Sequence, residues 1–353
     1  MNVEQGKYRV GRCPFHKGAA QTLVVNPDGT YYCLACGKSG KIGELSIETA
    51  KVSSWENDEC EKLYTLTQEA EMIFRNTLYS KYGQAGNTYV RNRGLSDETL
   101  REFGIGYAAN PEYIRSTLIK NGYTDDDLIA AGLYSRNEED GSVWFRFKNR
   151  VMFPIRDAAG RTVGFSGRVT DTSEPKYKNT PETLIFRKRE LLYGFDNVLK
   201  SGKNYLILCE GQMDVIAMQA AGIRNAAASL GTSLTEEHVS RISEFTDNVI
   251  LLYDTDAAGK KATERAIGML KGKVNVYVTN TDPCKDPDEF VRKYGAERLL
   301  QRIRHATPEA EWRILEAKNK DGEYDYSTVC DILLEEFSAD KISSILQKMS
   351  KKK

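Results

Sequence analysis

The sequence lacks several features that define whole classes of protein. It has no run of about 18 apolar residues, so no transmembrane helix is predicted. The first seven residues contain no apolar core, so no secretory signal is expected. Neither sign of charge is in excess, because 50 Lys and Arg residues balance 50 Asp and Glu residues. We therefore expect a soluble, cytoplasmic protein with no membrane partner.

The composition also excludes a disordered chain, since 40% of the 353 residues are hydrophobic and 28% are charged. At about 100–200 residues per domain, this length predicts two or three domains. The zero net charge conceals an uneven distribution, because residues 146–204 carry +7 and residues 205–256 carry −6. This contrast fits a polyanion-binding surface beside an acidic metal site. The counts alone favour the alternative, a solvated face followed by helix-capping carboxylates, so the motifs must decide between them.

The seven cysteines are an odd number without a secretory signal, which argues against a disulfide framework. Cys13 and His16 are separated by two residues, as are Cys33 and Cys36, and this spacing is typical of tetrahedral zinc. Residues 22–32 predict two strands joined by an Asn-Pro-Asp-Gly turn. We expect a zinc ribbon with one structural Zn²⁺, because four ligands complete the site. The alternative is a set of small buried cysteines with an incidental histidine.

The other cysteines and histidines have no ligand partners at suitable spacing. Cys209 lies in an apolar strand and is expected in the core. His238 and His305 lie in charge-rich helical patterns and are expected at the surface. Residues 38 to about 67 lack a strong periodic pattern, which predicts the end of the ribbon, a short helix and a mobile tether.

Apolar strands alternate with helical segments from Tyr205 onward. Strands are predicted over residues 205–209, 225–229, 248–253 and 273–278, with helices over 212–221, from 235, and over 257–270. Strands separated by helices of this length predict crossover units and a parallel sheet.

Carboxylates follow the ends of two of these strands. Glu210 ends the first, and Asp254 and Asp256 end the third, where parallel sheets collect their ligands. Asp214 lies one helical turn after Glu210 and faces the same crevice. A later acidic loop adds Asp286 and Asp288. These oxygens suit Mg²⁺, and a pair of ions supports phosphoryl or nucleotidyl transfer.

Helix capping is the alternative explanation for these carboxylates, because acidic side chains stabilise helix N-termini. Capping explains Asp256 or Asp288 taken singly. It does not explain Glu210, Asp254 and Asp256 together at neighbouring strand ends.

The preceding segment combines basic and aromatic residues. Residues 145–155 alternate apolar and basic side chains, which predicts an antiparallel strand with one wet, positive face. A hairpin turn over 156–161 leads to a returning strand over 162–168. Further Lys, Arg, Tyr and Phe follow in 175–179 and 186–189. This mixture suits a single-stranded nucleic acid with stacked bases, and a plain soluble face is the alternative.

An ordered series of short motifs runs through these segments. Besides the zinc pairs it contains Arg93-Gly-Leu95, Arg150-Val-Met-Phe-Pro-Ile155, Gly167-Arg168, Lys176-Tyr177, Leu192-Tyr-Gly194, Glu210-Gly-Gln-Met-Asp214, Leu230-Gly-Thr232, Asp254-Thr-Asp256-Ala-Ala-Gly259 and Asp286-Pro-Asp-Glu289. Over about residues 10–310 the series resembles the DnaG-type primases of bacteria and their phages.

The resemblance implies an α+β multidomain fold. Its parts would be a template-recognising zinc ribbon (1–45), a linker (46–67), the basic amino-terminal subdomain of an RNA polymerase domain (68–204), a catalytic Toprim subdomain with a parallel α/β sheet (205–295) and a helical carboxyl-terminal segment (296–353).

The resemblance also assigns roles to individual residues. It implies catalytic, metal-binding roles for Glu210, Asp254 and Asp256, with Asp214, Asp286 and Asp288 supporting them around two or more Mg²⁺ or Mn²⁺ ions. It implies contacts to template and nucleotides for Arg93, Arg150, Arg168, Lys176, Tyr177, Lys178 and Lys188. The reaction would be synthesis of short RNA primers from ribonucleoside triphosphates on single-stranded DNA during replication. A replicative helicase would be a partner.

Two other functions fit part of the sequence: a non-catalytic zinc and Toprim recombination mediator that binds DNA, and a Toprim nuclease. The complete acidic set and the long basic segment favour a primase. The sequence departs from the family at Gln212, where Tyr is usual, and at Thr255, where Gly is usual. The short segment 296–353 predicts a truncated chain or a compact phage primase, located in the bacterial or host cytoplasm.

Overall fold

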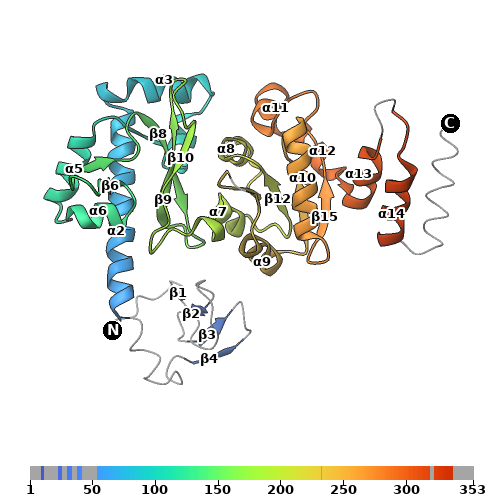
Figure 1. The fold of residues 1–353 in the computed structure, drawn as a ribbon, viewed down its shortest axis with the longest axis horizontal. Helices are drawn as coiled ribbons and strands as arrows, with labels where there is room; N and C mark the ends of the chain where they lie inside the picture. The colour runs from blue at the N-terminus through green and yellow to red at the C-terminus, as the bar shows by residue number, and fades with distance from the viewer. Residues whose placement is uncertain are drawn as a thin grey trace.

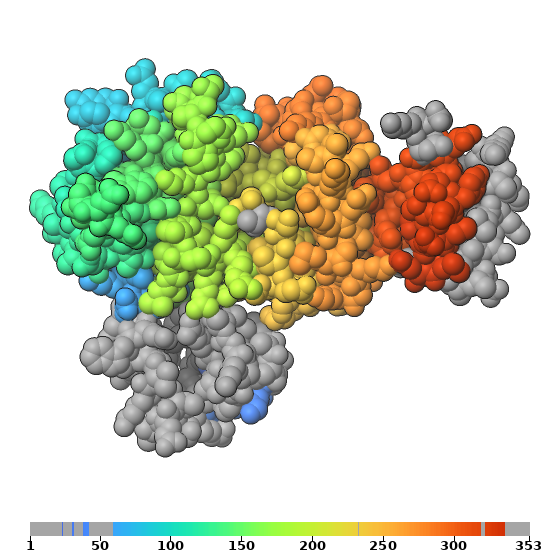
Figure 2. Space-filling view, in the orientation of Figure 1, coloured from blue at the N-terminus to red at the C-terminus, as the bar shows by residue number. Residues whose placement is uncertain are grey.

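The computed structural model describes residues 9–11, 23–25, 30–33, 38–41, 54–231, 233–318 and 322–336. Most of them form two α/β lobes, which lie side by side and are followed by a pair of helices (Figure 1). We call residues 54–191 the first lobe and residues 192–308 the second lobe. Their packed faces share one hydrophobic core, and Figure 2 shows the contact between them on one side of the molecule. Within the described ranges, no helix has the length and apolarity that a membrane span requires.

The amino-terminal strands form a four-stranded antiparallel sheet in the order β1-β2-β3-β4. Its strands are β1 (Arg9–Gly11), β2 (Leu23–Val25), β3 (Thr30–Cys33) and β4 (Ser39–Lys41). Leu23 pairs with Cys33, which confirms the two expected strands, while the turn between them lies outside the described residues. Three of the four zinc ligands, Cys13, His16 and Cys36, lie outside the described residues, and Cys33 is described by its backbone alone. The zinc site therefore stays a prediction.

The tether expected over residues 46–67 is wrong for its second half, because residues 54–67 belong to the long helix α2 (Ser54–Leu78). Leu63, Leu66 and Phe74 are fully buried along one stripe of this helix. The stripe is narrow and charged residues surround it, which is why the sequence shows little periodicity there. Burial of this stripe against the first lobe, at about 1.5–3 kcal/mol for each large side chain, stabilises the helix.

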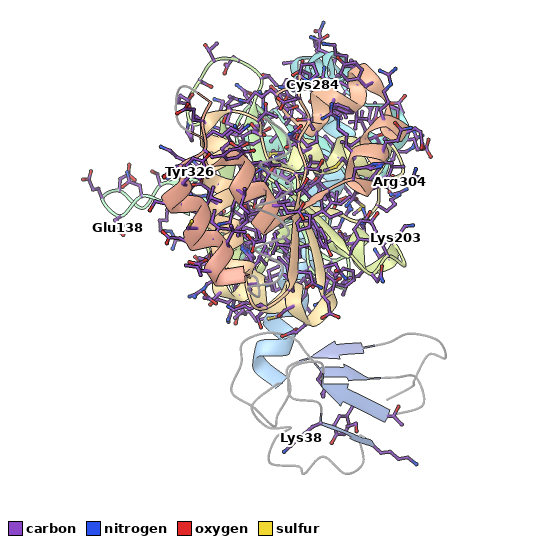
Figure 3. The ribbon with its side chains drawn as sticks, turned by 90° about the vertical axis from the view of Figure 1, so that its right-hand side faces the viewer. Lys38, Glu138, Lys203, Cys284, Arg304 and Tyr326 are labelled. Carbon is purple, nitrogen blue, oxygen red and sulfur yellow. The ribbon has the colours of Figure 1, made fainter. Side chains whose placement is uncertain are left out.

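The first lobe packs α2 against a four-stranded antiparallel sheet in the order β10-β9-β8-β5. Its elements after α2 are η2 (Lys81–Gly83), α3 (Gln84–Asn92), α4 (Asp97–Glu102), β5 (Gly106–Ala108), α5 (Pro111–Lys120), α6 (Asp125–Ala130), β6 (Tyr134–Arg136), β7 (Val143–Phe145), β8 (Arg150–Arg156), β9 (Thr162–Val169), β10 (Tyr177–Asn179) and η3 (Lys188–Glu190). Phe74 meets Phe165 edge to face, with ring centroids 5.1 Å apart. The exposed β6–β7 hairpin projects from this lobe, with Glu138 near its tip (Figure 3).

The single strand with a wet, positive face expected over residues 145–155 is wrong. The chain turns over 146–149, with Asn149 at a φ of 56°, and β8 begins only at Arg150. β8 pairs with β9 on one side and β5 on the other, and it is buried from Arg150 to Ile155. Its central position and the cover of α2 bury both faces. The hairpin turn and the returning strand β9 are confirmed.

The second lobe is built on a six-stranded sheet in the order β11-β13-β12-β14-β15-β16. The four inner strands are parallel, as expected from the alternation of strands and helices, and the two short edge strands are antiparallel. Its elements are β11 (Leu192–Tyr193), α7 (Phe195–Lys200), β12 (Leu206–Cys209), α8 (Gln212–Ala220), β13 (Ala226–Ser229), α9 (Glu236–Phe245), β14 (Asn248–Leu251), α10 (Ala257–Leu270), β15 (Asn275–Val278), α11 (Pro287–Tyr294), α12 (Ala296–Arg304) and β16 (Thr307–Pro308). Cys209 is buried, as expected.

The surface position expected for His238 is wrong, because its side chain is fully buried in the first turn of α9. Its Nδ1 accepts a hydrogen bond from the Thr235 backbone at 3.2 Å, and its Nε2 lies 3.0 Å from the Leu191 carbonyl oxygen. Burial lowers the pKa of His238, so the neutral ring serves as a structural link. His305 is exposed, as expected.

The described chain ends with two packed helices, α13 (Glu309–Glu316) and α14 (Tyr326–Glu336). Ala310 and Ile314 of α13 pack against Val329, Ile332 and Leu333 of α14. Tyr326 begins α14 on the face that is turned toward the viewer in Figure 3. This pair confirms the expected helical character of the residues that follow the second lobe.

Candidate active site and nucleic-acid interface

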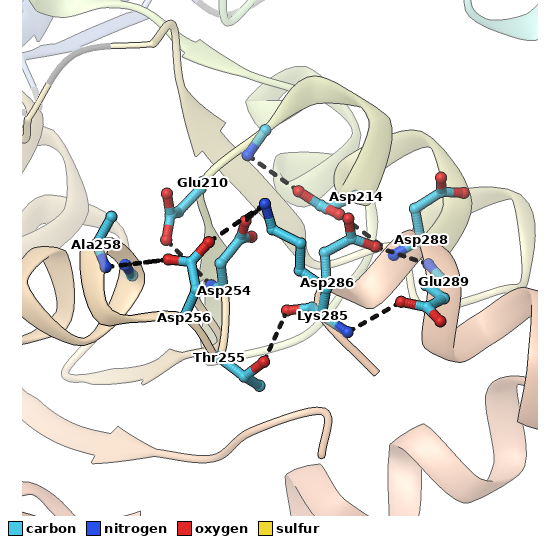
Figure 4. Close-up of polar contacts among 12 residues, drawn as sticks. Glu210, Asp214, Asp254, Thr255, Asp256, Ala258, Lys285, Asp286, Asp288 and Glu289 are labelled. Atoms are coloured by element: carbon cyan, nitrogen blue, oxygen red, sulfur yellow. Dashed lines mark hydrogen bonds and ion pairs between the residues drawn. The ribbon is translucent and has the colours of Figure 1, made fainter. Parts of the chain in front are cut away.

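Three carboxylates follow the ends of two neighbouring parallel strands. Glu210 directly follows β12, and Asp254 and Asp256 follow β14, which pairs with β12 (Figure 4). The Asp254 backbone N–H donates to Glu210 Oε1 at 3.0 Å, so the two strand ends are tied together. The topology of the sheet thus brings Glu210 to the same end of the sheet as two aspartates that lie 44 and 46 positions later in the sequence.

Asp256 also caps α10. Its Oδ1 accepts hydrogen bonds from the backbone N–H groups of Ala258 at 3.0 Å and Gly259 at 2.9 Å, which leaves Oδ2 directed into the crevice. A Cβ atom at Gly259 would lie 2.1 Å from the Asp254 carbonyl oxygen, so only glycine permits this close turn. Capping and the crevice role are therefore compatible, because each uses a different oxygen of the same carboxylate.

A second acidic group lies beside the first. Asp214, in the first turn of α8, is buried and accepts hydrogen bonds from the Gly211 N–H at 3.1 Å and the Asp288 N–H at 3.2 Å. Asp286 caps α11 by accepting from the Glu289 N–H at 2.8 Å. These contacts join α8 to α11, so Asp214 holds the acidic loop in place as well as adding charge.

Burial and mutual repulsion disturb the titration of these carboxyl groups. Burial, followed by the charges of Glu210 and Asp286, raises the pKa of Asp254 to about 6. Burial also raises the pKa of Glu210, although the hydrogen bond from the Asp254 backbone opposes this. Burial raises the pKa of Asp214 well above its usual range. Asp256 differs, since its helix-capping hydrogen bonds lower its pKa.

The crevice fits a divalent cation in its chemistry, because its donors are hard carboxylate oxygens whose repulsion a cation would relieve. The amino group of Lys285 already places a positive charge there, 3.2 Å from Asp256 Oδ2 and 3.6 Å from Asp254 Oδ2. Among the described residues, however, no three acidic, histidine or cysteine side chains are yet close enough together to hold one metal ion. The structure thus brings the expected ligands to one crevice without forming a finished coordination sphere.

Alternating basic and aromatic side chains form a stack on the adjoining face of the first lobe. Arg168 lies over the ring of Tyr89 at 4.5 Å and faces the ring of Tyr177 at 5.6 Å, while Arg93 lies 5.8 Å from Tyr89. We call these four residues the Arg–Tyr stack. Its edge touches the acidic group, because Arg93 forms an ion pair with the buried carboxylate of Asp288 at 3.1 Å.

The other predicted nucleic-acid contacts occupy different environments. Lys176 is exposed, and Lys188 is half-buried in η3. Lys178 lies 4.9 Å from the ring of Trp144, an exposed aromatic residue that also contacts Arg146. These side chains add basic and aromatic groups to the first lobe.

Arg150 does not lie on the wet face expected for it. Its side chain is buried, and its Nη1 donates to the carbonyl oxygens of Pro175 at 2.9 Å and Gly167 at 3.0 Å. These bonds hold the approach to β10 against β9. The structure therefore favours a structural role for this guanidinium.

Sequence reasoning missed Tyr89, Trp144 and Lys285. The first had a detectable signal, since Tyr89 stands four residues before Arg93 and so shares a face of α3 with it. No sequence pattern indicated the contact of Trp144 with Lys178 or that of Lys285 with the two aspartates, because these partners come from other elements.

Comparison with known proteins agrees with this geometry. Residues 73–199 match the family described as the DNA primase catalytic core, N-terminal domain, residues 207–291 match the Toprim-like family, and residues 3–72 match the CHC2 zinc finger. The crystal structure of a DNA primase domain from Pseudomonas aeruginosa is 35% identical, with a TM-score of 0.66 over 72% of this chain and 82% of that one. The chain belongs to the DnaG-type primase family. The expected resemblance and the mixed α/β fold class are confirmed.

Two further members of the primase family extend the comparison. The DNA primase of Staphylococcus aureus strain COL is 34% identical over 334 residues, which cover 86% of this chain and 56% of that protein. A DnaG primase catalytic domain whose structure was determined bound to single-stranded DNA is 33% identical, with a TM-score of 0.65 over 75% of this chain and 87% of that one. The chain thus spans about half the length of the curated relatives it matches.

Proposed function

We propose that this chain is a DNA primase, a DNA-directed RNA polymerase that joins ribonucleoside triphosphates into short RNA primers on single-stranded DNA. One observation carries the proposal: the acidic residues that accompany the strand-end carboxylates include Asp288, which forms an ion pair with Arg93 of the Arg–Tyr stack. Metal-ligating oxygens and nucleic-acid-binding side chains are the two components that template-directed nucleotidyl transfer requires. The DnaG primase domain bound to single-stranded DNA supports this choice of template.

In the proposed reaction, Glu210, Asp254 and Asp256 would hold two or more Mg²⁺ or Mn²⁺ ions. When bound, these ions lower the barrier to attack of a primer hydroxyl on the nucleotide α-phosphate and neutralise the departing pyrophosphate. Asp214 and Asp286 keep the surrounding loops in register through their backbone hydrogen bonds.

The Arg–Tyr stack would orient the template beside these carboxylates. A guanidinium held against an aromatic ring keeps its planar face and charge in a fixed position, which suits contact with phosphates and stacked bases. The exposed Lys176 would add a less specific phosphate contact. Arg150 would act indirectly, by supporting the segment that carries Lys176 and Tyr177.

The zinc ribbon would contribute one structural Zn²⁺, held by Cys13, His16, Cys33 and Cys36. The match of residues 3–72 to the CHC2 zinc finger supports this assignment. A replicative helicase as partner remains a prediction from the family resemblance.

The test is incorporation of labelled ribonucleotides on single-stranded DNA with Mg²⁺ or Mn²⁺, using Glu210→Gln and Asp254→Asn. Both variants should lose at least about 100-fold in rate, the order expected when a metal-centred step is disrupted. Asp247→Asn is the matched control, because Asp247 is exposed just before β14, at the amino-terminal end of the strand and so away from the carboxylates at its other end. Full activity of either crevice variant would refute the metal mechanism.

The same gel separates the two rival functions. Shortening of the template in the presence of Mg²⁺ would identify a nuclease. Strong DNA binding without any product, on templates of varied sequence, would favour a non-catalytic recombination mediator.

A further inference from the structure

The side chain of Lys285 lies among the strand-end carboxylates, a position that no pattern in the sequence around it predicts. It belongs to the loop between β15 and α11, and its amino group points back into the crevice between Asp254 and Asp256 (Figure 4). The distances from Nζ are 3.6 Å to Asp254 Oδ2 and 3.2 Å to Asp256 Oδ2. One ammonium group therefore bridges the two carboxylates that follow β14.

Lys285 contacts the Oδ2 atoms of Asp254 and Asp256, which accept none of the backbone hydrogen bonds described above. Asp256 uses Oδ1 to cap α10, and only its Oδ2 faces Lys285. A divalent cation bound by Asp254 and Asp256 would need the same free oxygens. Two cations cannot occupy this position together at such distances, because their repulsion would exceed what two shared carboxylates offset.

The backbone of Lys285 is fixed, while its side chain is not. The Thr255 N–H donates to the Lys285 carbonyl oxygen at 3.0 Å, and the Thr255 hydroxyl contacts the carbonyl oxygens of Cys284 at 3.2 Å and Lys285 at 3.3 Å. On the other side, the Lys285 N–H donates to Glu289 Oε2 at 3.0 Å. The lysine side chain itself is 59% exposed, so it can swing into water without any change in the loop.

Thr255, which lies between the paired aspartates, connects them to the loop that carries Lys285. Its own backbone carries Asp254 and Asp256 on either side, and its polar groups clamp the loop that carries Lys285. The aspartates and the lysine are thus connected through a single residue, which keeps the ammonium group within reach of both carboxylates.

We propose that Lys285 is an internal counter-cation: its ammonium group occupies the cation position between Asp254 and Asp256, and an incoming divalent ion displaces it into solvent. Lys285 thereby sets the Mg²⁺ or Mn²⁺ concentration at which the crevice fills. This inference rests on the proposed function, because it takes the same carboxylates to be metal ligands.

The test is direct titration of the full chain, with its zinc retained, by Mn²⁺, with free Mn²⁺ followed by electron paramagnetic resonance. Lys285→Met should bind Mn²⁺ about threefold to tenfold more tightly, the size expected when two partly exposed ion pairs no longer compete. Lys273→Met is the matched control, since Lys273 pairs with Glu236 near the start of β15, away from the crevice, and its loss changes the net charge equally. It should leave the affinity unchanged.

Thermal unfolding gives a second measurement that does not depend on activity. Without divalent ions at pH 7.5, Lys285→Met should unfold at a lower temperature than the unaltered chain, because the two carboxylates lose their cation. Saturating Mn²⁺ should remove this difference. Thr255→Val, which loses the hydroxyl clamp and keeps the side-chain shape, should bind Mn²⁺ with an affinity between those of the other two chains.

Asp254→Asn distinguishes failure of this inference from failure of the proposed function. If Asp254→Asn binds Mn²⁺ as well as the unaltered chain does, the carboxylates are not the metal ligands and the proposed function loses its basis. If Asp254→Asn binds weakly but Lys285→Met and Lys285→Gln show unchanged or weaker affinity, the carboxylates bind metal and the lysine does not compete. That second result would overturn the proposal that Lys285 is an internal counter-cation.

Discussion

Substitution of Asp254 by asparagine should stabilise the protein in the absence of divalent ions, although it should abolish activity. The raised pKa of about 6 means that the folded state disfavours the charged carboxylate. Asparagine is nearly the same size and carries no charge, so it removes this unfavourable burial. The expected gain depends on pH, because the carboxyl group is neutral in both states in acid.

The magnitude follows from the shift of the pKa. From an ordinary value near 3.9, a rise of about two units corresponds to about 3 kcal/mol between the two protonation states. The Asp254 side chain is 19% exposed, so solvent screening reduces the expected gain to about 1–2 kcal/mol. For a chain of this size that gain raises the melting temperature by about 1–3 °C.

The sign of the pH dependence is fixed by the same shift. The protonated carboxyl group contributes its full stability below about pH 4, and this stability falls between about pH 4 and pH 6, where the folded state holds a proton at Asp254 that the unfolded state has released. This contribution is lost as the pH rises through about 6. The advantage of Asp254→Asn should therefore be small near pH 4 and fully developed at pH 7.5.

The assay is thermal unfolding of both chains at pH 4.5 and pH 7.5 in a chelator of Mg²⁺ that spares zinc, followed by the same scans in Mg²⁺. Magnesium should stabilise the unaltered chain by about 1.4 kcal/mol at ten times its Kd, and should not stabilise Asp254→Asn. Asp247→Asn serves as the control and should show neither effect. A lower melting temperature for Asp254→Asn at pH 7.5 without Mg²⁺ would refute the reasoning.

Three other predictions concern the supporting structure. Arg150→Met should lower the free energy of unfolding by about 2–3 kcal/mol in urea titrations, because it leaves buried carbonyl oxygens without a hydrogen-bond donor. Lys176→Met should leave this free energy unchanged, and it should reduce the salt dependence of single-stranded DNA binding by about one ion. Gly259→Ala should cost at least about 2 kcal/mol and weaken Mn²⁺ binding, since its Cβ would overlap the Asp254 carbonyl oxygen. Elemental analysis should find one zinc per chain, and its removal should abolish template-dependent synthesis while Mn²⁺ binding by the crevice persists.

The parallel sheet and its strand-end carboxylates were predictable because each depends on a local pattern. Apolar runs that end in Glu210 and in Asp254 mark buried strands, and the rules of parallel topology then bring their carboxyl ends together. The helix over residues 54–67 was missed for a related reason, since its apolar stripe becomes evident only against the lobe that covers it.

Other features depend on contacts between elements that no local pattern encodes. Arg150 and Arg168 look alike in the sequence, yet the first is buried beneath backbone carbonyls and the second is stacked on Tyr89. The difference follows from strand register: Arg168 lies opposite Val151 of β8 and Tyr177 of β10, whereas Arg150 lies opposite Val169, so the two arginines are on opposite faces of the sheet. A count of basic residues therefore overestimates the positive surface available to a nucleic acid.

The zero net charge of the sequence is consistent with a charge-balanced junction between the two lobes. Arg93 of the first lobe and Arg292 of the second both bind the carboxylate of Asp288, whose side chain is only 3% exposed. A buried carboxylate between two guanidiniums is stable only while both remain in place. Because Arg93 also stacks on Tyr89, a template that moved the Arg–Tyr stack would disturb Asp288 and, through its backbone N–H, the buried Asp214. This chain of contacts is a path by which binding on the basic surface would reach the acidic residues beside the strand ends.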